Sequence, residues 1–369
     1  MIIGVARETK THEYRVGLTP QGVAQLVRDG HRVLVETAAG KGSGFDDGAY
    51  RAAGGDIAGT QAVFADAELL VKVKEPLPSE FHLLHEGQTL FTYLHLAPNP
   101  QLVQFLLDRK VTAFAYETLE KAGTFPLLIP MSEIAGRMAP LVGSQFLQRP
   151  FGGSGVLPCG VPGIRPARAV IVGAGIVGRN AARTAAGLGL ETVVLNRSAD
   201  RLREIDREFR DAVRTRLLDE WSLLEEAGSA DMVIGALYAP GGKTPVVIGR
   251  DLLSRMKPGA VIVDVAIDQG GCAETSRPTT HDQPVFSVDG ILHYCVANMP
   301  GAYPSTSTQA LANATLPYIR KLAREGADEA VRTSPELASA LNTRHGMIVH
   351  PRVAAALQTG STPTSEKFP

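Results

Sequence analysis

Residues 167–203 read ARAVIVGAGIVGRNAARTAAGLGLETVVLNRSADRLR, and this stretch decides the fold class. The apolar run "AVIVG" predicts a buried strand, and "RNAARTAAGLG" predicts a helix directly after it. Between them, Gly173, Gly175 and Gly178 form a G-x-G-x-x-G turn. In such a turn, the first glycine permits the tight bend, the second lets the backbone approach a pyrophosphate, and the third lets helix and strand pack closely. The strand–turn–helix context predicts a dinucleotide site in a Rossmann-like domain.

The end of the next strand indicates which dinucleotide fits. An acidic residue usually stands there and holds the ribose 2′-hydroxyl of NAD, but this chain has Asn196. Asparagine can still bond a hydroxyl and does not repel a 2′-phosphate. Arg197 and Arg201 follow, and arginine suits bidentate phosphate contacts. These residues leave NAD and NADP equally open.

Strands and helices alternate on both sides of this stretch, which predicts mostly parallel sheets covered on both faces. Before it, the predicted strands are "MIIGVA", "RVLVE", "LLVKVKE", "TLFTYLHL" and "VTAFAYE". From Ala169 onward they are "AVIVG", "TVVLN", "MVIGAL", "AVIVDVA" and "PVFSVDGILHYCV". Between the first two strands, Thr19 is a predicted N-cap, with Pro20 at the first helical position and Gly30 as the terminator.

Two long helices connect the two series. Residues 131–149 predict one helix, and residues 305–326 predict a second, in which Pro317 is expected to produce a kink. We infer an α/β fold of two Rossmann-like doubly wound domains joined by long helices. The substrate (catalytic) domain is expected to be discontinuous, over 1–130 and 305–369. The dinucleotide-binding domain, with the connecting helix, is expected over 131–304.

The composition excludes several classes of protein. With 369 residues, 44% of them hydrophobic and 20% charged, a two-domain globular protein is expected. The net charge of −1 gives no basic field for nucleic acid or a membrane surface. Three cysteines, none in a C-x-x-C pair, favour reduced thiols. Neither a signal peptide nor a membrane span is recognisable, so a cytoplasmic location is expected.

Four other segments place reactive side chains just beyond predicted strands, where ligands bind in open α/β sheets. They contribute Arg15; Lys72 and Lys74; Tyr93 and His95; and Asp268. Arginine is a natural anchor for a carboxylate, and histidine can move protons near neutral pH. Each also has a structural interpretation, such as a lysine at a strand end or an aspartate that caps a turn.

Together these segments resemble the alanine dehydrogenase/pyridine nucleotide transhydrogenase family over roughly residues 1 to 350. The resemblance rests on "GVARETKTHEYRVGLTP", "VKVKEP", "FTYLHLA", "AYET", "PMSEIAGR", "GVPGI", "GAGIVG", "DVAIDQGGC", "SRPTTHDQPVF", "YCVANMPGAYPSTST" and "ALANATLPY". It implies reversible oxidative deamination of L-alanine to pyruvate and ammonia, with hydride transfer to a nicotinamide. It also implies NAD as the cofactor and a homohexamer.

The resemblance also implies a role for each matching residue. Arg15 would pair with the substrate carboxylate, Lys74 would contact the carboxylate and carbonyl oxygen, and His95 and Asp268 would be acid/base groups. Tyr93 is expected to line the pocket. Besides the three glycines, Asn196, Arg197 and Asp268, the expected cofactor contacts are Ser132, Ile176, Val177, Arg201, Leu237, Tyr238, Val265, Ala266, Ile267, Arg277, Val296, Ala297, Asn298 and Met299.

Two departures from the family pattern concern the cofactor: Asn196 replaces the acidic residue, and Leu218 stands where relatives have a serine. They keep open an NADP-linked enzyme that joins an amino acid to a 2-oxo acid by reductive amination (a carboxyalkyl amino acid dehydrogenase). A third interpretation is a transhydrogenase-like nucleotide-binding subunit. Glu117 in "AYET" matches a position that holds a metal in some relatives, but a lone carboxylate is poor evidence for a metal site, so no metal is expected.

Overall fold

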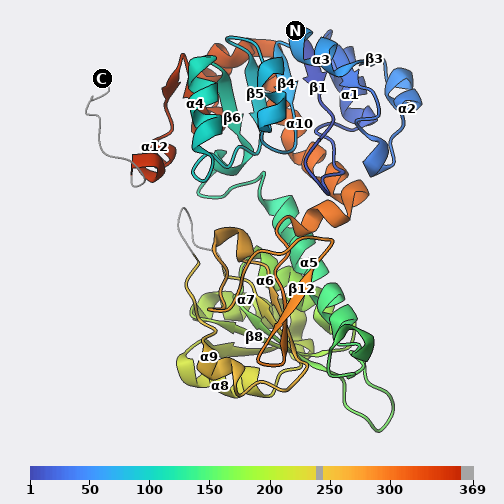
Figure 1. Cartoon of the computed structure of the whole chain (residues 1–369), viewed down its shortest axis with the longest axis vertical. Coiled ribbons are helices and arrows are strands. Elements are labelled where there is room, and N and C mark those ends of the chain that lie inside the picture. The colour runs from blue at the N-terminus through green and yellow to red at the C-terminus, as the bar shows by residue number, and fades with distance from the viewer. Residues whose placement is uncertain (238–243, 359–369) are drawn as a thin grey trace. The chain divides into compact units, whose positions relative to one another are not determined.

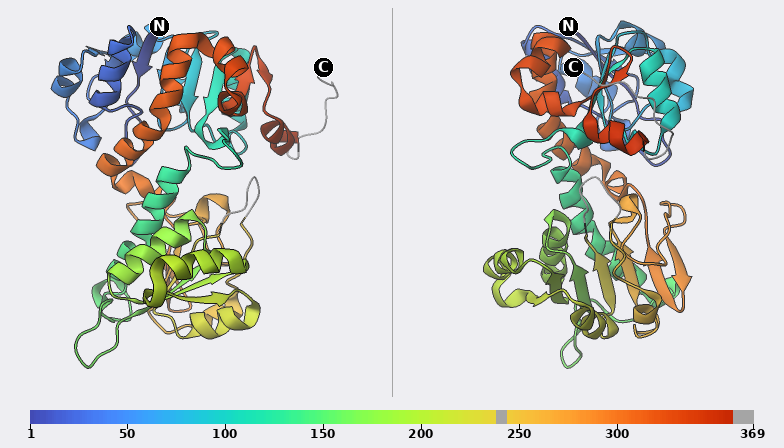
Figure 2. Two further views of the ribbon diagram at one scale, coloured as in Figure 1. Left: turned by 180° about the vertical axis from the view of Figure 1, so that it is seen from behind. Right: turned by 90° about the vertical axis from the view of Figure 1, so that its left-hand side faces the viewer.

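The computed structural model describes residues 1–237 and 244–358, and the chain forms two compact units (Figures 1 and 2). Unit 1 comprises Met1–Met131 and Gly301–Pro369, and unit 2 comprises Ser132–Pro300. Each unit contains a mostly parallel sheet with helices packed on it. The predicted α/β fold class is therefore confirmed.

The sheet of unit 1 has the strand order β15-β14-β6-β5-β4-β1-β2-β3 within the described residues. Its strands β1 to β6 pair in parallel, while β14 and β15 extend the edge beside β6 in antiparallel fashion. The bounds are β1 Ile2–Val5, β2 Arg32–Glu36, β3 Asp56–Ala58, β4 Leu69–Val71, β5 Thr89–Thr92, β6 Thr112–Ala115, β14 Leu341–Arg344 and β15 Met347–Ile348.

Helices cover both faces of this sheet, and the core residues divide accordingly. One core cluster takes side chains from α1 and α10, and the cluster on the opposite face takes them from α3 and α4. Figure 1 shows α4 in front of the sheet, and the view from behind in Figure 2 brings α10 to the front. The bounds are α1 Pro20–Arg28, α2 Asp47–Ala52, α3 Thr60–Asp66, α4 Pro100–Asp108, α10 Pro304–Thr333, α11 Pro335–Ala340 and α12 Pro351–Gln358.

The helix boundaries bear on two local predictions. The predicted N-cap of α1 is confirmed, because the Thr19 side chain accepts a hydrogen bond from the Gly22 N–H. Pro317 lies inside α10, and the kink expected there stays a prediction; the non-helical residue of α10 is Gly326, whose φ is 75° and at which the expected helix 305–326 ends. Glycine adopts positive φ at little cost, so the chain turns where it meets least steric resistance.

The sheet of unit 2 has the order β12-β13-β11-β10-β7-β8-β9 within the described residues. All pairs are parallel except β12 with β13. The strands are β7 Arg168–Val172, β8 Glu191–Asn196, β9 Arg214–Leu217, β10 Met232–Gly235, β11 Val261–Asp264, β12 Val285–Val288 and β13 Ile291–Tyr294. The helices are α5 Ile129–Phe146, α6 Ile176–Gly187, α7 Ala199–Phe209, α8 Glu220–Gly228 and α9 Arg250–Leu253.

Two predicted elements of this unit differ in detail. The stretch "PVFSVDGILHYCV" forms a hairpin of β12 and β13, because Asp289 and Gly290 both have positive φ and make a two-residue turn. The helix expected over 131–149 runs from Ile129 to Phe146, and it packs closely on the start of α6. A Cβ added to Gly136 would lie 2.4 Å from the Val177 carbonyl oxygen.

Strand order also predicts where each unit binds ligands. In unit 1, β2 and β3 lie on one side of β1, and β4, β5 and β6 on the other, so the order reverses between β1 and β4. In unit 2, the same reversal lies between β7 and β10. Ligands bind beyond the carboxyl ends of strands at such switch points. Ligand-binding residues are therefore expected on the segments after β1, β4, β5, β7 and β10.

Candidate active site

The glycine turn after β7 has the geometry that the sequence motif requires. Gly173 has a φ of 119°, and a Cβ there would lie 2.4 Å from the Ala236 carbonyl oxygen. A Cβ on Gly178 would lie 1.8 Å from the Gly173 carbonyl oxygen. On Gly175, the nearest atom to an added Cβ is the Arg201 Nη1 at 3.8 Å. The first and third glycines thus serve close packing, while the second leaves room for a phosphate at the start of α6.

The side chain of Asn196, at the end of β8, forms hydrogen bonds with backbone groups of neighbouring segments. Its Oδ1 accepts from the Ala174 N–H at 3.2 Å, and its Nδ2 donates to the Ser198 carbonyl at 3.3 Å. The asparagine therefore helps to hold the glycine turn in place. It also lies at the position where the ribose of the cofactor is expected. Arg197 and Arg201 are both exposed beside it.

A cavity of about 380 Å³ opens beside Arg197, and its volume is within the usual range for small-molecule sites. Leu218 forms part of its wall, so the departure from serine removes a hydroxyl from this surface. The other lining residues are Arg197, Asp219, Glu220, Leu223, Leu224, Val246, Val247, Gly249, Asp251 and Leu252.

The loop after β11 carries four expected cofactor contacts, and Asp264 shapes it. This carboxylate is 1% exposed and accepts from the Ala266 N–H at 3.1 Å, the Cys272 N–H at 2.7 Å and the Ser276 hydroxyl at 2.6 Å. Sequence reasoning missed this role of Asp264. Within the loop, Ala266 and Ile267 are buried and Val265 is half-buried, whereas the predicted acid/base Asp268 is exposed.

The remaining cofactor candidates of unit 2 lie on several segments. Arg277 is exposed, and its guanidinium lies 4.4 Å from the centre of the Phe286 ring. Ser132 is half-buried on α5, and Leu237 is half-buried just after β10. Tyr238 lies outside the described residues. The segment after β13 contains Val296, Ala297, Asn298 and Met299.

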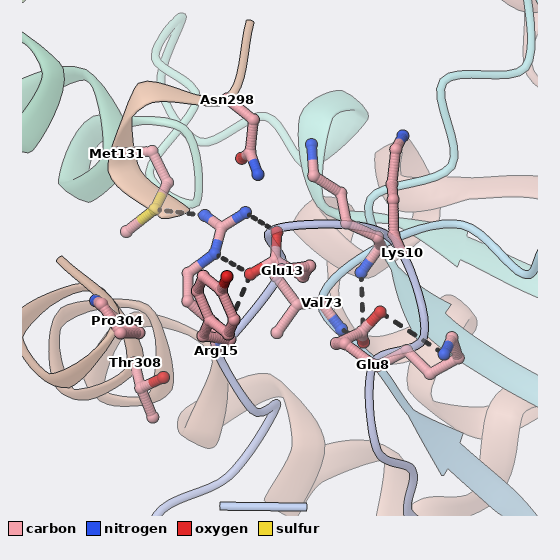
Figure 3. Close-up of polar contacts among 12 residues, drawn as sticks. Glu8, Lys10, Glu13, Arg15, Val73, Met131, Asn298, Pro304 and Thr308 are labelled. Carbon is pink, nitrogen blue, oxygen red and sulfur yellow. Dashed lines mark hydrogen bonds and ion pairs between the residues drawn. The ribbon is translucent and has the colours of Figure 1, made fainter. Parts of the chain in front are cut away.

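In unit 1, Arg15 and Glu13 form a buried ion pair (Figure 3). The Arg15 Nε donates to Glu13 Oε1 at 2.6 Å, its Nη2 donates to Oε2 at 2.5 Å, and its Nη1 donates to the Met131 Sδ at 3.0 Å. Arg15 is 2% exposed. Burial opposes the charge, but the hydrogen bonds that Arg15 donates to Glu13 raise the pKa of Arg15. The guanidinium is therefore a permanently charged group with a fixed plane.

The two lysines after β4 have different surroundings. Lys72 is fully buried, with its Nζ 2.9 Å from Glu80 Oε1 and 3.4 Å from Glu8 Oε2. Lys74 is half-buried, and its Nζ lies 6.0 Å from the centre of the Tyr93 ring. Burial, followed by the positive charge of Arg15, lowers the pKa of Lys74. Lys72 thus supports the fold, while Lys74 is the lysine beside the other site candidates.

Glu8 connects these lysines to the first loop, and sequence reasoning missed it. Its Oε1 accepts from the Val73 N–H at 2.6 Å and from the Lys74 N–H at 3.3 Å (Figure 3). The Lys74 carbonyl in turn accepts from the Thr92 hydroxyl at 2.9 Å. The backbone of Lys74 is therefore held on both sides.

Tyr93 and His95 follow β5, and their rings stack with centroids 6.0 Å apart and planes 13° apart. The Tyr93 hydroxyl donates to the Leu127 carbonyl at 2.7 Å, and the ring is 4% exposed. His95 is exposed and has a φ of 47°. Its backbone N–H donates to Glu117 Oε1 at 2.7 Å. Unit 1 thus gathers Arg15, Lys74, Tyr93 and His95 near one another.

Glu75 adds an unexpected carboxylate at this edge of the sheet. Its Oε1 lies 2.6 Å from the Lys10 Nζ, whereas its Oε2 is buried and has no hydrogen-bond partner among the described residues. Burial raises its pKa, but Lys10 and then the charge of His95 outweigh that effect and lower it.

No group of three or more metal-ligating side chains occurs within residues 1–237 and 244–358.

Comparison with known proteins identifies the family. The alanine dehydrogenase/PNT N-terminal domain model matches residues 4–135, and the C-terminal domain model matches residues 139–351. This chain belongs to the alanine dehydrogenase/PNT family. Its relatives include alanine dehydrogenase of Bacillus subtilis, 49% identical over 97% of this chain and 95% of the relative. Another is alanine dehydrogenase of Mycobacterium tuberculosis H37Rv, 50% identical over 97% of both chains.

Solved structures agree with this family assignment. A structure of L-alanine dehydrogenase superimposes with a TM-score of 0.95 at 45% identity, covering 98% of this chain and all of that one. A transhydrogenase from Sinorhizobium meliloti gives a TM-score of 0.81 at 23% identity over 95% of this chain and 99% of that chain, which shows a shared fold. In the described part of the chain, no helix is long and apolar enough to cross a bilayer.

Proposed function

We propose that this chain is an alanine dehydrogenase. The reaction converts L-alanine, water and NAD⁺ into pyruvate, ammonium, NADH and a proton, and it runs in both directions. The observation that carries the proposal is the full-length identity of 49% and 50% to two alanine dehydrogenases, with at least 95% of each relative covered. The cluster of Arg15, Lys74 and His95 in unit 1 supplies the chemistry that this reaction needs.

Arg15 and Lys74 bind the substrate in this proposal. The planar guanidinium, oriented by Glu13, pairs with the carboxylate that alanine and pyruvate share. Lys74 donates to the carboxylate and carbonyl oxygen and stabilises negative charge that grows on the oxygen in the transition state. Tyr93 forms a wall, since its hydroxyl is already bonded to the Leu127 carbonyl.

His95 is the proton-transfer group. Water must add to an imine carbon, and the resulting carbinolamine must lose a proton from its hydroxyl as ammonia leaves. An imidazole titrates near neutral pH, so it can take a proton in one step and return it in another. Asp268 is proposed as a second acid/base, and its exposed carboxylate lies within the loop that Asp264 shapes.

Unit 2 is proposed to hold the dinucleotide, which accepts or donates the hydride when bound. The turn fits a pyrophosphate, because Gly175 leaves room where the N–H groups of α6 begin. We propose NAD as the cofactor, with Arg197 and Arg201 as the residues that decide tolerance of NADP. The other proposed contacts are the cofactor candidates of unit 2 named above.

We also propose that the chain self-associates, with six copies as the family expectation. An apolar hairpin supports this: Leu157, Val161 and Ile164 are 54%, 53% and 67% exposed on the segment before β7. Val161 and Ile164 face each other across an antiparallel bridge, so the side chains gather at one tip. Neighbouring exposed apolar side chains of this kind often mark a surface that contacts another protein.

A spectrophotometric assay tests the activity. Purified protein is offered NAD or NADP with several amino acids, and NADH or NADPH with pyruvate plus ammonia. We expect turnover with L-alanine, and with pyruvate only when ammonia is present. Oxidation of the reduced cofactor that needs an amino acid instead of ammonia would identify the carboxyalkyl amino acid dehydrogenase reaction. Cofactor binding without any turnover would identify a transhydrogenase-like subunit.

A further inference from the structure

His95 has an unusual backbone for a residue with a side chain. Its φ of 47° lies in the left-handed region, where the Cβ of an L-amino acid is crowded. Such strain persists only where surrounding contacts hold it, and it gathers at functional sites. The neighbours Leu94 and Leu96 are 0% and 2% exposed, whereas the imidazole between them is exposed. The strained residue therefore carries an outward-facing side chain between two buried anchors.

Glu117 binds the amino side of this strained segment. Its Oε1 accepts from the His95 N–H at 2.7 Å and from the Leu94 N–H at 3.1 Å, and its Oε2 lies 3.2 Å from the Leu94 nitrogen. Successive N–H groups that converge in this way form a concave site for an anion. Here the chain supplies the anion itself.

The strand register explains why Glu117 reaches this position. The parallel strands β5 and β6 end their pairing at Thr92 and Ala115. Leu94 and Glu117 each follow two residues later, so the two segments leave the sheet side by side. The 3₁₀ turn Tyr116–Thr118 then carries the carboxylate.

Asn99 binds the carbonyl side. Its Nδ2 donates to the His95 carbonyl at 2.9 Å. Asn99 stands at the N-cap of α4, where asparagine normally accepts from the first turn of the helix, but its side chain makes no such bond. The Asn99 side chain thus forms its hydrogen bond with His95 instead of capping its own helix.

We propose that Glu117 is a positioning residue that, with Asn99, fixes the left-handed backbone of His95 and so the direction of its imidazole. The role in turnover rests on the proposed function, but the backbone clamp does not. Glu117 acts through the peptide N–H of His95 and is not assigned a contact with substrate or cofactor. Removing it frees His95 to relax toward ordinary φ values, which turns the ring away from its position.

A thermal-stability cycle tests the clamp without any assay of activity. Glu117→Ala is made in three backgrounds: His95, His95→Ala and His95→Gly. We expect Tm to fall by about 2–4 °C in the first two, since both retain a Cβ at the strained position. In the glycine background the loss should be larger, because glycine adopts positive φ without strain, so no release of strain offsets the lost hydrogen bonds. Equal losses in all three backgrounds would overturn the clamp.

Kinetics test the consequence for catalysis. Glu117→Ala should lower kcat by about ten- to a hundredfold, while KM for pyruvate and NADH affinity change less than about threefold. Glu117→Gln keeps one acceptor oxygen and should retain an intermediate kcat. In the His95→Ala background, Glu117→Ala should cause no further loss of residual turnover. A further loss of the full size, or an unchanged kcat in Glu117→Ala, would refute the positioning role.

The matched control is Glu36→Gln. Glu36 is a buried carboxylate of unit 1 that, like the half-buried Glu117, accepts a backbone N–H, here from Arg7 at 2.8 Å, and it has no contact with the His95 segment. Its variant should keep kcat even if Tm falls. If the wild-type protein turns over no alanine, the proposed function fails, and the stability cycle still decides whether Glu117 holds His95.

Discussion

Glu13 and Arg15 face each other across two hydrogen bonds, at 2.6 Å and 2.5 Å, and both side chains are at most 2% exposed. The two residues are only two positions apart in the chain, so the backbone between them must turn to bring the two side chains into one plane. The Glu13 carboxylate balances the charge of the buried Arg15. It also fixes the plane of the guanidinium in the orientation that a carboxylate ligand requires.

Glu13→Gln should therefore impair both folding and substrate binding. Removing one partner of a buried ion pair costs about 3–5 kcal/mol, because the remaining charge is left uncompensated. We expect KM for pyruvate to rise and the denaturant midpoint to fall, measured by steady-state kinetics and urea unfolding. Glu86→Gln, which removes one partner of the exposed pair with Lys110, is the control and should leave both unchanged. A Glu13→Gln protein with wild-type values would show that Arg15 needs no such partner.

His95→Ala should lower kcat by about two to four orders of magnitude, which is the range for loss of a general acid/base. NADH affinity, measured by fluorescence titration, should stay near the wild-type value, because the imidazole belongs to unit 1. His82→Ala replaces an exposed histidine of the same unit and serves as the control. Turnover that survives His95→Ala would remove the residue from its proposed role.

The sequence indicated these reactive residues but not the groups that hold them. Strands such as β7 and β8 were predictable because apolar runs and glycine spacing are local properties. The polar edge strand β9, with sequence RTRL, carries no such pattern, and β14 joins β6 across more than 200 residues. Local patterns cannot indicate such pairings.

The same limit applies to the partners within the site. Glu117 reaches His95 only because the register of β5 with β6 aligns Thr92 with Ala115. Glu8 reaches Lys74 across the pairing of β1 with β4. In each case the strand register determines which carboxylate lies beside the reactive residue, and the register depends on the whole sheet. Only Glu13 lay close enough in sequence to Arg15 for the charge pattern itself to have indicated the pair.

Lys74 should make substrate binding sensitive to alkaline pH. Its pKa is lowered, so the ammonium loses its proton at a lower pH than an ordinary lysine, whose pKa is about 10.4. The charged form binds the anionic ligand, so binding is strong below this pKa and weakens as pH rises through it. Inhibition by oxamate, an anion that resembles pyruvate, measures this without the titration of ammonia.

Lys74→Arg should move that loss of oxamate binding to higher pH, because a guanidinium keeps its charge. Lys110→Met, which removes an exposed lysine of unit 1, is the control and should leave the pH profile unchanged. An identical alkaline limb in Lys74→Arg and wild type would assign the titration to another group.

Arg197→Ala and Arg201→Ala should distinguish the two dinucleotides. If the arginines bind a 2′-phosphate, each variant weakens NADPH binding by about tenfold or more and leaves NADH binding within about twofold. Arg203→Ala is the control: Arg203 lies on helix α7 with Arg201 but is paired with Asp200. Equal effects of Arg197→Ala or Arg201→Ala on the two cofactors would show that these arginines do not read the phosphate.

The exposed hairpin before β7 should govern self-association. A Val161→Asp/Ile164→Asp double variant places two charges where apolar side chains gather, and a buried unpaired carboxylate is strongly disfavoured. Light scattering coupled to size exclusion should then report a smaller particle than the wild type at the same concentration. The control is Trp221→Asp, since Trp221 is 75% exposed on α8, outside the hairpin. Because the hairpin lies at the surface, both variants should keep the wild-type thermal transition of the isolated subunit, so a change in mass reflects assembly. A double variant with the mass of the wild type would place the contacts between copies elsewhere.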